Sequence, residues 1–273
     1  MANFHTDQWI MEQVKKHYDE GLSVLSHAPT VGVFYQGSGN YGLDYSGSDV
    51  DTKLITIPTL DDICFNKKPI STTHIRENEE HIDLKDIRLY FQCFRKQNIN
   101  FLEILFTPYY LINKDYNEDW TKLIKHKEDI AHYDVLTAAA CLKGNLMDKY
   151  HALKHPYPNK RAVLAQFGYD PKQLHHLVRY HEFAFRFLNG ESYEDCLISK
   201  QSDYLISLKE GLYNLEKAEE VASKYFNEAV EFIDSFRENN QGMPKNQKVD
   251  DLLNDIQASI IKKSITKELS QQC

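Results

Sequence analysis

Residues 34–51 read FYQGSGNYGLDYSGSDVD, and this stretch decides which fold the chain is expected to adopt. Its first half places Gly37, Gly39 and Gly42 in a G-x-G-x-x-G arrangement after an apolar run, which is typical of a dinucleotide-binding turn. Its second half places Asp49 and Asp51 one residue apart, which is typical of metal-dependent phosphate chemistry. The two halves predict different folds, and the residues around them decide between the two.

The dinucleotide interpretation requires a crossover helix after the glycine turn and an acidic residue about 20 positions further on. Position 57 is isoleucine, and only ten residues separate Ser38 from Asp49, whereas a parallel crossover needs about a dozen or more. A protein-kinase glycine loop is disfavoured too, because no V-A-I-K strand or H-R-D loop follows. A Rossmann-type oxidoreductase is therefore the least favoured function.

The acidic pair fits its surroundings better. Residues i and i+2 of a strand point to the same face, so Asp49 and Asp51 are expected to lie together at the head of the strand VDTKLITIP. Two such carboxylates repel unless divalent cations lie between them, and Mg²⁺ or Mn²⁺ with a nucleotide triphosphate suits this arrangement. Gly37 and Ser38, at the end of the preceding strand, are expected to offer backbone N–H groups and a hydroxyl to the phosphates.

At these residues the chain resembles the nucleotidyltransferase superfamily that includes DNA polymerase beta. The shared signature is Gly37-Ser38, a ten-residue spacer and Asp49-Val50-Asp51. The segments HIDLKDIRLYF (81–91) and NINFLEILF (98–106) resemble a bacterial and phage branch of predicted nucleotidyltransferases, some of them labelled as RNA-repair proteins. The resemblance covers residues 31–110 well, extends more weakly into GYDPKQLHHLVRYHEF, and implies an NTP substrate such as ATP.

The superfamily normally uses a third acid on a neighbouring strand, and two residues compete for this role. Asp83 lies in a brief strand that leads into a helix, and it is favoured as the third metal ligand. Glu103 lies in NFLEILF, an apolar run expected to be a central strand, where a buried acid needs a partner. The structural alternatives are a helix cap for Asp83 and an ion pair with Arg88 or Arg95 for Glu103.

A helix expected within residues 170–185 carries basic residues at a spacing that aligns them along one face. Similar proteins place Lys, His or Arg of a helical second domain against the nucleotide. The resemblance therefore implies nucleotide contacts for Lys172, His176 and Arg179, and more weakly for Lys209, whereas a solvated helix surface is the alternative for each residue.

Composition narrows the remaining possibilities. The 273 residues are 42% hydrophobic and 26% charged, which is typical of a globular protein, and no apolar run is long enough to span a membrane. We expect a cytoplasmic protein without a membrane partner.

The five cysteines are scattered and form no C-x-x-C pair, which disfavours a disulfide framework and a cysteine zinc site. A net charge of −8 disfavours a large nucleic-acid surface, although residues 149–186 carry a local basic excess.

The hydrophobic periodicity predicts an α+β fold: a nucleotidyltransferase core with a small mixed sheet in residues 1–115, followed by a C-terminal helical domain in residues 116–273. The expected elements are a helix within 6–28, strands at 30–36, 50–58 and 100–108, a strand that turns into a helix within 81–98, and an amphipathic helix at 250–270. This last helix is expected to pack against the helical bundle or a partner chain.

Two functions from different classes follow. The favoured one is a Mg²⁺-dependent nucleotidyltransferase that moves NMP from an NTP to an acceptor hydroxyl on an RNA end, a small molecule or a protein, and releases pyrophosphate. The alternative is a catalytically inactive nucleotide-binding or partner-binding module of the same fold. The acids at positions 49 and 51 favour the enzyme, because a degenerate site would be free to lose them.

Overall fold

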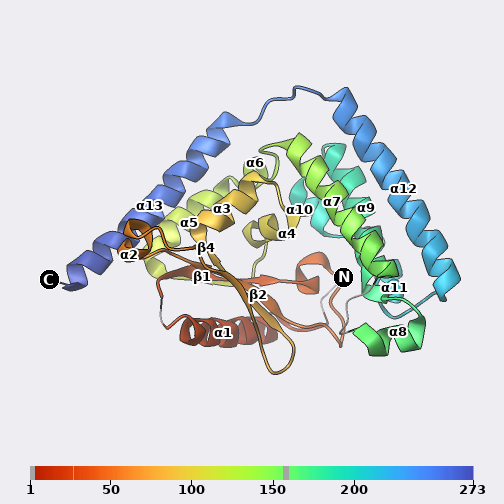
Figure 1. The fold of residues 1–273 in the computed structure, drawn as a ribbon, viewed down its shortest axis with the longest axis horizontal. Coiled ribbons are helices and arrows are strands. Elements are labelled where there is room, and N and C mark those ends of the chain that lie inside the picture. Colours follow the sequence, from red (N-terminus) through yellow and green to blue (C-terminus); the bar gives the residue numbers. More distant parts are fainter. Residues whose placement is uncertain (1–3, 27, 156–159, 273) are drawn as a thin grey trace. The chain divides into compact units, whose positions relative to one another are not determined.

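The computed structural model describes residues 4–26, 28–155 and 160–272 (Figure 1). It has an α+β fold with a mixed five-stranded sheet and many helices, as predicted. By residue contacts the chain forms two compact units. Unit 1 comprises Met1–Asn40, Asp44–Tyr133 and Asn246–Cys273, and unit 2 comprises Tyr41–Leu43 and Asp134–Lys245. These bounds differ from the division at residue 115 that the sequence predicts. That division concerns independently folding domains, and it stays a prediction.

The sheet belongs to unit 1 and has the strand order β3-β4-β2-β1-β5. The strands β2 and β4 run parallel, and the other neighbours are antiparallel. The strands are β1 (Thr30–Gln36), β2 (Asp51–Thr56), β3 (Ser71–Ile75), β4 (His81–Asp86) and β5 (Tyr110–Ile112). Because β1 is a β-branched and aromatic run between Pro29 and Gly37, it forms a strand whose residues 30–35 are all buried.

The helices of unit 1 lie on both faces of this sheet (Figure 1). The helix α1 packs on one face and contributes Ile10 and Val14 to a core with Val33, Leu54 and Leu84. Trp120 packs on the other face, with its ring centroid 4.2 Å from that of Phe34. The helices are α1 (Asp7–Val24), α2 (Leu60–Cys64), α3 (Ile87–Arg95), α4 (Ile99–Leu102), α5 (Asn117–Lys125), α6 (Lys127–Ala131) and α13 (Gln247–Gln272), with 3₁₀ turns at Ser38–Tyr41, Glu103–Leu105 and Lys114–Tyr116.

One sequence prediction about unit 1 is wrong. Residues 100–108 do not form a strand, because Asn98 caps a short helix and a 3₁₀ turn follows it. The edge strand β5 comes only afterwards, at Tyr110–Ile112. The terminal helix α13 packs on α3 and on α5, which lies within the helical region expected from residue 116 onwards, and Lys263 donates to Asp119 at 2.7 Å.

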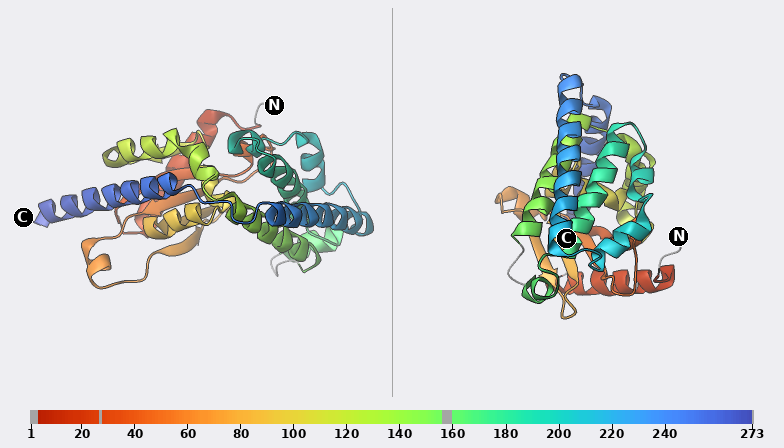
Figure 2. Two further views of the ribbon diagram at one scale, coloured as in Figure 1. Left: turned by 90° about the horizontal axis from the view of Figure 1, so that it is seen from above. Right: turned by 90° about the vertical axis from the view of Figure 1, so that its right-hand side faces the viewer.

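Unit 2 is a bundle of helices centred on α9. Asp170 caps α9 by accepting from the Lys172 N–H, and twelve of its 18 residues are buried. The helices α7 and α12 both run alongside it (Figure 2). The helices are α7 (Val135–Lys154), α8 (Arg161–Phe167), α9 (Pro171–Leu188), α10 (Tyr193–Leu197), α11 (Ser202–Lys209) and α12 (Leu215–Asn239). Among the described residues, no helix is both long and apolar enough to cross a membrane.

Candidate functional site

The acidic pair lies at the start of β2, where Asp51 stands opposite Gln36 of β1 in the sheet register. Asp51 is the first residue of the strand, whereas Asp49 precedes the strand and is exposed. The Oδ1 atom of Asp51 accepts from the His81 backbone N–H at 2.9 Å and lies 3.1 Å from Nδ1 of the same histidine. The strand therefore fixes Asp51, and the preceding residues carry Asp49.

The two carboxylates are close enough to influence one another. Burial raises the pKa of Asp51 above its ordinary value of 3.8, and the negative charge of Asp49 raises this pKa further, against the opposing effect of His81. A divalent cation between the two groups would remove this repulsion, and carboxylate oxygens are the ligands that Mg²⁺ and Mn²⁺ accept. Asp49 and Asp51 therefore fit a cation by both charge and donor type.

The raised pKa, caused first by burial and then by the charge of Asp49, predicts that Asp51 destabilises the metal-free protein at neutral pH. A carboxyl whose pKa is raised by folding costs stability above that pKa, and the cost disappears as the pH falls below the unfolded value. We expect Asp51→Asn to raise the melting temperature by about 2 °C at pH 7 in EDTA, and to leave it unchanged near pH 3. Calorimetry at both pH values measures this difference.

Asp62→Asn is the matched control, because a hydrogen bond from the Thr59 N–H lowers the pKa of Asp62. This variant should lower the melting temperature at pH 7. Equal shifts of the same sign in the two variants would show that folding does not raise the pKa of Asp51.

The glycine turn is joined to the segment that carries Asp49. The Ser38 hydroxyl donates to Oγ of Ser48 at 2.9 Å, and the same Oγ accepts from the Tyr45 N–H at 3.0 Å. Ser48 immediately precedes Asp49 in the chain. The loop thus closes on itself, and the two halves of the quoted stretch meet at Ser38 and Ser48.

The carboxylate of Glu103 fixes the other side of the turn. Glu103 is 1% exposed, and its Oε1 accepts from the Gly37 N–H at 3.1 Å and from Nδ2 of Asn40 at 2.6 Å. The Gly37 N–H therefore donates to the protein itself, contrary to the prediction that it faces a phosphate. Of the two arginines suggested as ion-pair partners for Glu103, Arg88 pairs with Asp86, and Arg95 pairs with Asp250.

Asp83 lies on β4, directly opposite Lys53 of β2. Its Oδ2 atom is 3.0 Å from the Lys53 ammonium. The helix cap suggested as an alternative for Asp83 is instead Asp86, whose side chain accepts from the Arg88 N–H. Over the ranges 4–26, 28–155 and 160–272, no three His, Cys, Asp or Glu side chains are grouped as a metal site would require. The predicted trio of Asp49, Asp51 and Asp83 is therefore not assembled in this state.

Sequence reasoning missed a buried network behind the acidic pair. Oε1 of Glu80 accepts from the N–H of Val50, the residue between the two acids, at 3.2 Å. Oε2 of Glu80 lies 2.6 Å from Arg76 and 3.0 Å from Nε2 of His17, whose Nδ1 lies 3.0 Å from the Thr52 hydroxyl. Burial opposes ionisation of Glu80, but hydrogen bonds, first of all that to His17, hold its pKa at about 2. No linear spacing connects residues 17, 52 and 80, so the sequence gives no signal for this network.

The predicted basic residues of unit 2 lie near one another on and around α9. Burial lowers the pKa of His175 to about 3, and the charges of Lys209, Arg179 and Lys172 contribute to this effect. Lys172 is exposed, whereas the Arg179 guanidinium is buried 4.0 Å from the ring centroid of Tyr41. The pKa of the fourth predicted residue, His176, lies well below 6.5, first because of burial and then because of His175, Arg179, Lys172 and Lys149 nearby. His176 is therefore neutral at pH 7 and adds no positive charge.

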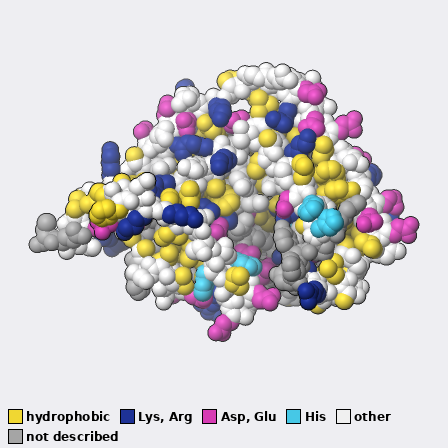
Figure 3. Space-filling view, viewed as in Figure 1, with side chains coloured by type: hydrophobic (Ala, Val, Ile, Leu, Met, Phe, Trp, Pro, Cys, Tyr) yellow, Lys and Arg dark blue, Asp and Glu magenta, His cyan; other side chains and the backbone are white. Residues whose placement is uncertain are grey.

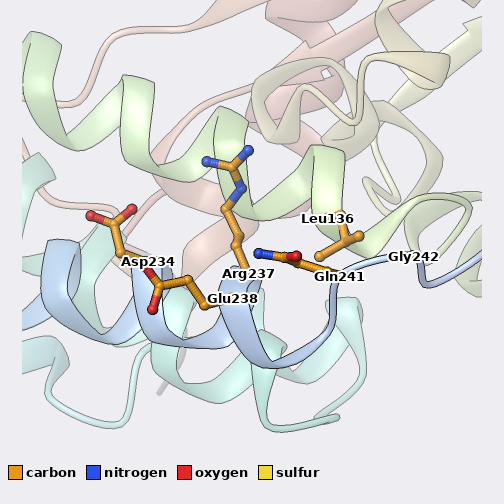
Figure 4. Close-up of a pocket in the computed structure, with 6 residues that line it drawn as sticks. All are labelled: Leu136, Asp234, Arg237, Glu238, Gln241 and Gly242. Carbon is orange, nitrogen blue, oxygen red and sulfur yellow. The ribbon is translucent and has the colours of Figure 1, made fainter.

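A separate pocket lies in unit 2 and contains none of the predicted residues (Figure 4). Its volume is about 400 Å³, and it is lined by Leu136, Asp234, Arg237, Glu238, Gln241 and Gly242. Asp234 at its edge already accepts from Lys143 at 2.7 Å. On the face that Figure 3 shows, Lys and Arg side chains are interspersed with Asp and Glu side chains.

Comparison with known proteins adds no family. The chain matches no protein-family model, and it matches no curated protein.

Proposed function

We propose that the protein is a Mg²⁺-dependent or Mn²⁺-dependent nucleotidyltransferase, built on a nucleotidyltransferase core, that moves NMP from an NTP to an acceptor hydroxyl and releases pyrophosphate. The observation that carries this proposal is the hydrogen bond between Ser38 and Ser48, which holds the glycine turn against the segment bearing Asp49. The effect of Asp49 on the pKa of Asp51 supports the proposal, because the two carboxylates are close enough to interact electrostatically.

Each part of this centre has a chemical role in the proposal. Asp49 and Asp51 hold the cation, and Ser38 supplies a hydroxyl next to the phosphates. A bound divalent ion supplies Lewis-acid stabilisation of charge that develops on a phosphoryl oxygen. Glu103 and Glu80 hold the turn and the Val50 backbone in position, through hydrogen bonds at 3.1 Å and 3.2 Å. Asp83 stays a candidate third acid.

The acceptor is a hydroxyl of an RNA end, a small molecule or a protein. The net charge of −8 disfavours a long RNA footprint, because binding phosphates requires clustered Lys and Arg. The local excess of basic residues at positions 149–186 suits the phosphates of a short RNA. A cytoplasmic location, where NTPs and Mg²⁺ are abundant, is part of the same proposal.

The proposal is tested by following the two ends of the triphosphate separately. The protein is incubated with Mg²⁺ or Mn²⁺, with total RNA or a cell extract, and with each NTP labelled at the α or the γ phosphate. We expect label on an acceptor from the α-labelled NTP only, together with pyrophosphate. Transfer of the γ label would indicate a kinase instead, and no transfer from any NTP would favour the inactive binding module.

The basic residues of unit 2 supply a prediction about binding. If Lys172 and Lys209 contact phosphate, the double variant Lys172→Gln, Lys209→Gln should weaken NTP binding about 100-fold, because each of the two hydrogen bonds to a charged group contributes roughly 1.5 kcal/mol. Titration calorimetry with Mg²⁺ and NTP measures the change. Lys217→Gln is the control, since Lys217 pairs with Glu220 on α12. Binding within twofold of wild type would remove both lysines from the nucleotide site.

A further inference from the structure

Lys53 is a buried lysine on the same face of the sheet as Asp51 and Asp83. Lys53 follows Asp51 by two positions on β2, so the two side chains leave the strand on the same side. The residue is only 5% exposed. Its ammonium lies 3.0 Å from Oδ2 of Asp83 and 4.1 Å from the ring centroid of Phe101. The sheet register sets this pairing, because Lys53 stands directly opposite Asp83.

The surroundings of Lys53 oppose its displacement. A buried ammonium that loses its carboxylate is strongly disfavoured, because water no longer solvates the charge. The Phe101 ring stabilises the cation further through its electron-rich face. A divalent ion that bound Asp83 would therefore have to displace Lys53 or approach another cation at short range, and both are unfavourable.

We infer that the Lys53 ammonium takes the place of a second divalent ion and, by pairing with Asp83, prevents this carboxylate from binding metal. The nucleotide-free protein therefore binds one divalent ion, through Asp49 and Asp51. This inference rests on the proposed function, which supplies the ion at the acidic pair. It adds the stoichiometry of that ion and, in the nucleotide-free protein, assigns Asp83 to a lysine rather than to a metal.

The test counts Mn²⁺ bound to the nucleotide-free full chain by electron paramagnetic resonance titration. We expect one Mn²⁺ per chain for wild type and two for Lys53→Met, which frees the Asp83 carboxylate without adding a charge. Lys85→Met is the matched control and should bind one. Lys85 also lies over Phe101, at 5.1 Å, but it donates to Ser71 rather than to Asp83.

The outcomes separate this inference from the proposed function. Two ions in wild type, or one ion in Lys53→Met, would overturn the role of Lys53 and leave the transferase proposal intact. No ion in wild type would overturn both.

The double variant Lys53→Met, Asp83→Asn gives an independent reading should Lys53→Met alone not fold, because it removes both partners of the buried ion pair and leaves neither charge unpaired. Because Asp83 is not a metal ligand in this inference, the double variant should bind one Mn²⁺ with an affinity within twofold of wild type. A tenfold or greater loss would overturn the inference.

Discussion

Exchanging Asp49 for asparagine is expected to lower the rate of NMP transfer by about 1,000-fold. An amide oxygen carries no charge and binds Mg²⁺ weakly, so the variant loses the stabilisation that the ion gives to the transition state. A loss of about 4 kcal/mol corresponds to this factor, since each 1.36 kcal/mol changes a rate tenfold. Single-turnover transfer to the acceptor found with labelled NTP measures the rate.

The same variant should keep its fold. Asp49 is exposed and lies outside the strand, and substitutions at such positions change stability by about 0.5 kcal/mol or less. Asp61→Asn makes the same chemical change at an exposed residue of α2 and should transfer at the wild-type rate. If Asp49→Asn retained more than a tenth of the wild-type rate, Asp49 would not be a ligand of the catalytic ion.

Replacing Glu103 with alanine is expected to cause the largest loss of stability, about 3 kcal/mol. The change leaves the Gly37 N–H and the Asn40 amide without their buried acceptor, and it opens a cavity beneath the turn. This loss corresponds to a fall of about 8 °C in melting temperature. Transfer should also fall about 100-fold, because a small displacement of the turn misplaces the phosphates.

Glu103→Gln separates support of the turn from metal binding. The amide keeps one oxygen that can accept from Gly37 and Asn40, so this variant should lose less than half as much stability as the alanine variant. Its affinity for Mn²⁺ should stay within twofold of wild type. Loss of Mn²⁺ binding in Glu103→Gln, with stability unchanged, would show instead that Glu103 is the third metal ligand that the sequence also allowed.

The elements with strong local signals were predictable. Thr6 caps α1, which lies within the expected helical span 6–28, and the run between Pro29 and Gly37 forms β1. The alternation from His81 to Asp86 changes to helical spacing where α3 begins, and the structure confirms both elements. Each of these segments carries both a periodicity and a boundary residue, which together select one conformation.

The strand prediction for residues 100–108 is wrong for a physical reason. A short apolar run suits a buried strand and a buried helical turn equally well, so periodicity alone cannot choose between them. The boundary residue decides, because the Asn98 side chain accepts from the Asn100 N–H and starts a helix. Glu103 therefore lies in a 3₁₀ turn rather than on a strand, and its carboxylate accepts a hydrogen bond from the Gly37 N–H.

The partners of the acids could not be read from the sequence. The pairing of Asp83 with Lys53 depends on the parallel register of β2 and β4, and the contact of Glu80 with Val50 joins residues 30 positions apart. Likewise, α13 joins unit 1 through contacts such as Arg95 with Asp250, across 155 positions. Such long-range pairs follow from tertiary packing, for which one sequence carries no local signal.

The central claim is that Asp49 and Asp51 together hold a divalent cation beside the glycine turn. The most direct measurement is anomalous X-ray scattering from crystals of the full chain grown with MnCl₂ and a non-hydrolysable NTP analogue. We expect a Mn²⁺ peak in contact with carboxylate oxygens of both residues and with the phosphates of the analogue. We expect these phosphates to lie next to Ser38. A fully ordered site without a Mn²⁺ peak, or an analogue bound away from both aspartates, would contradict it.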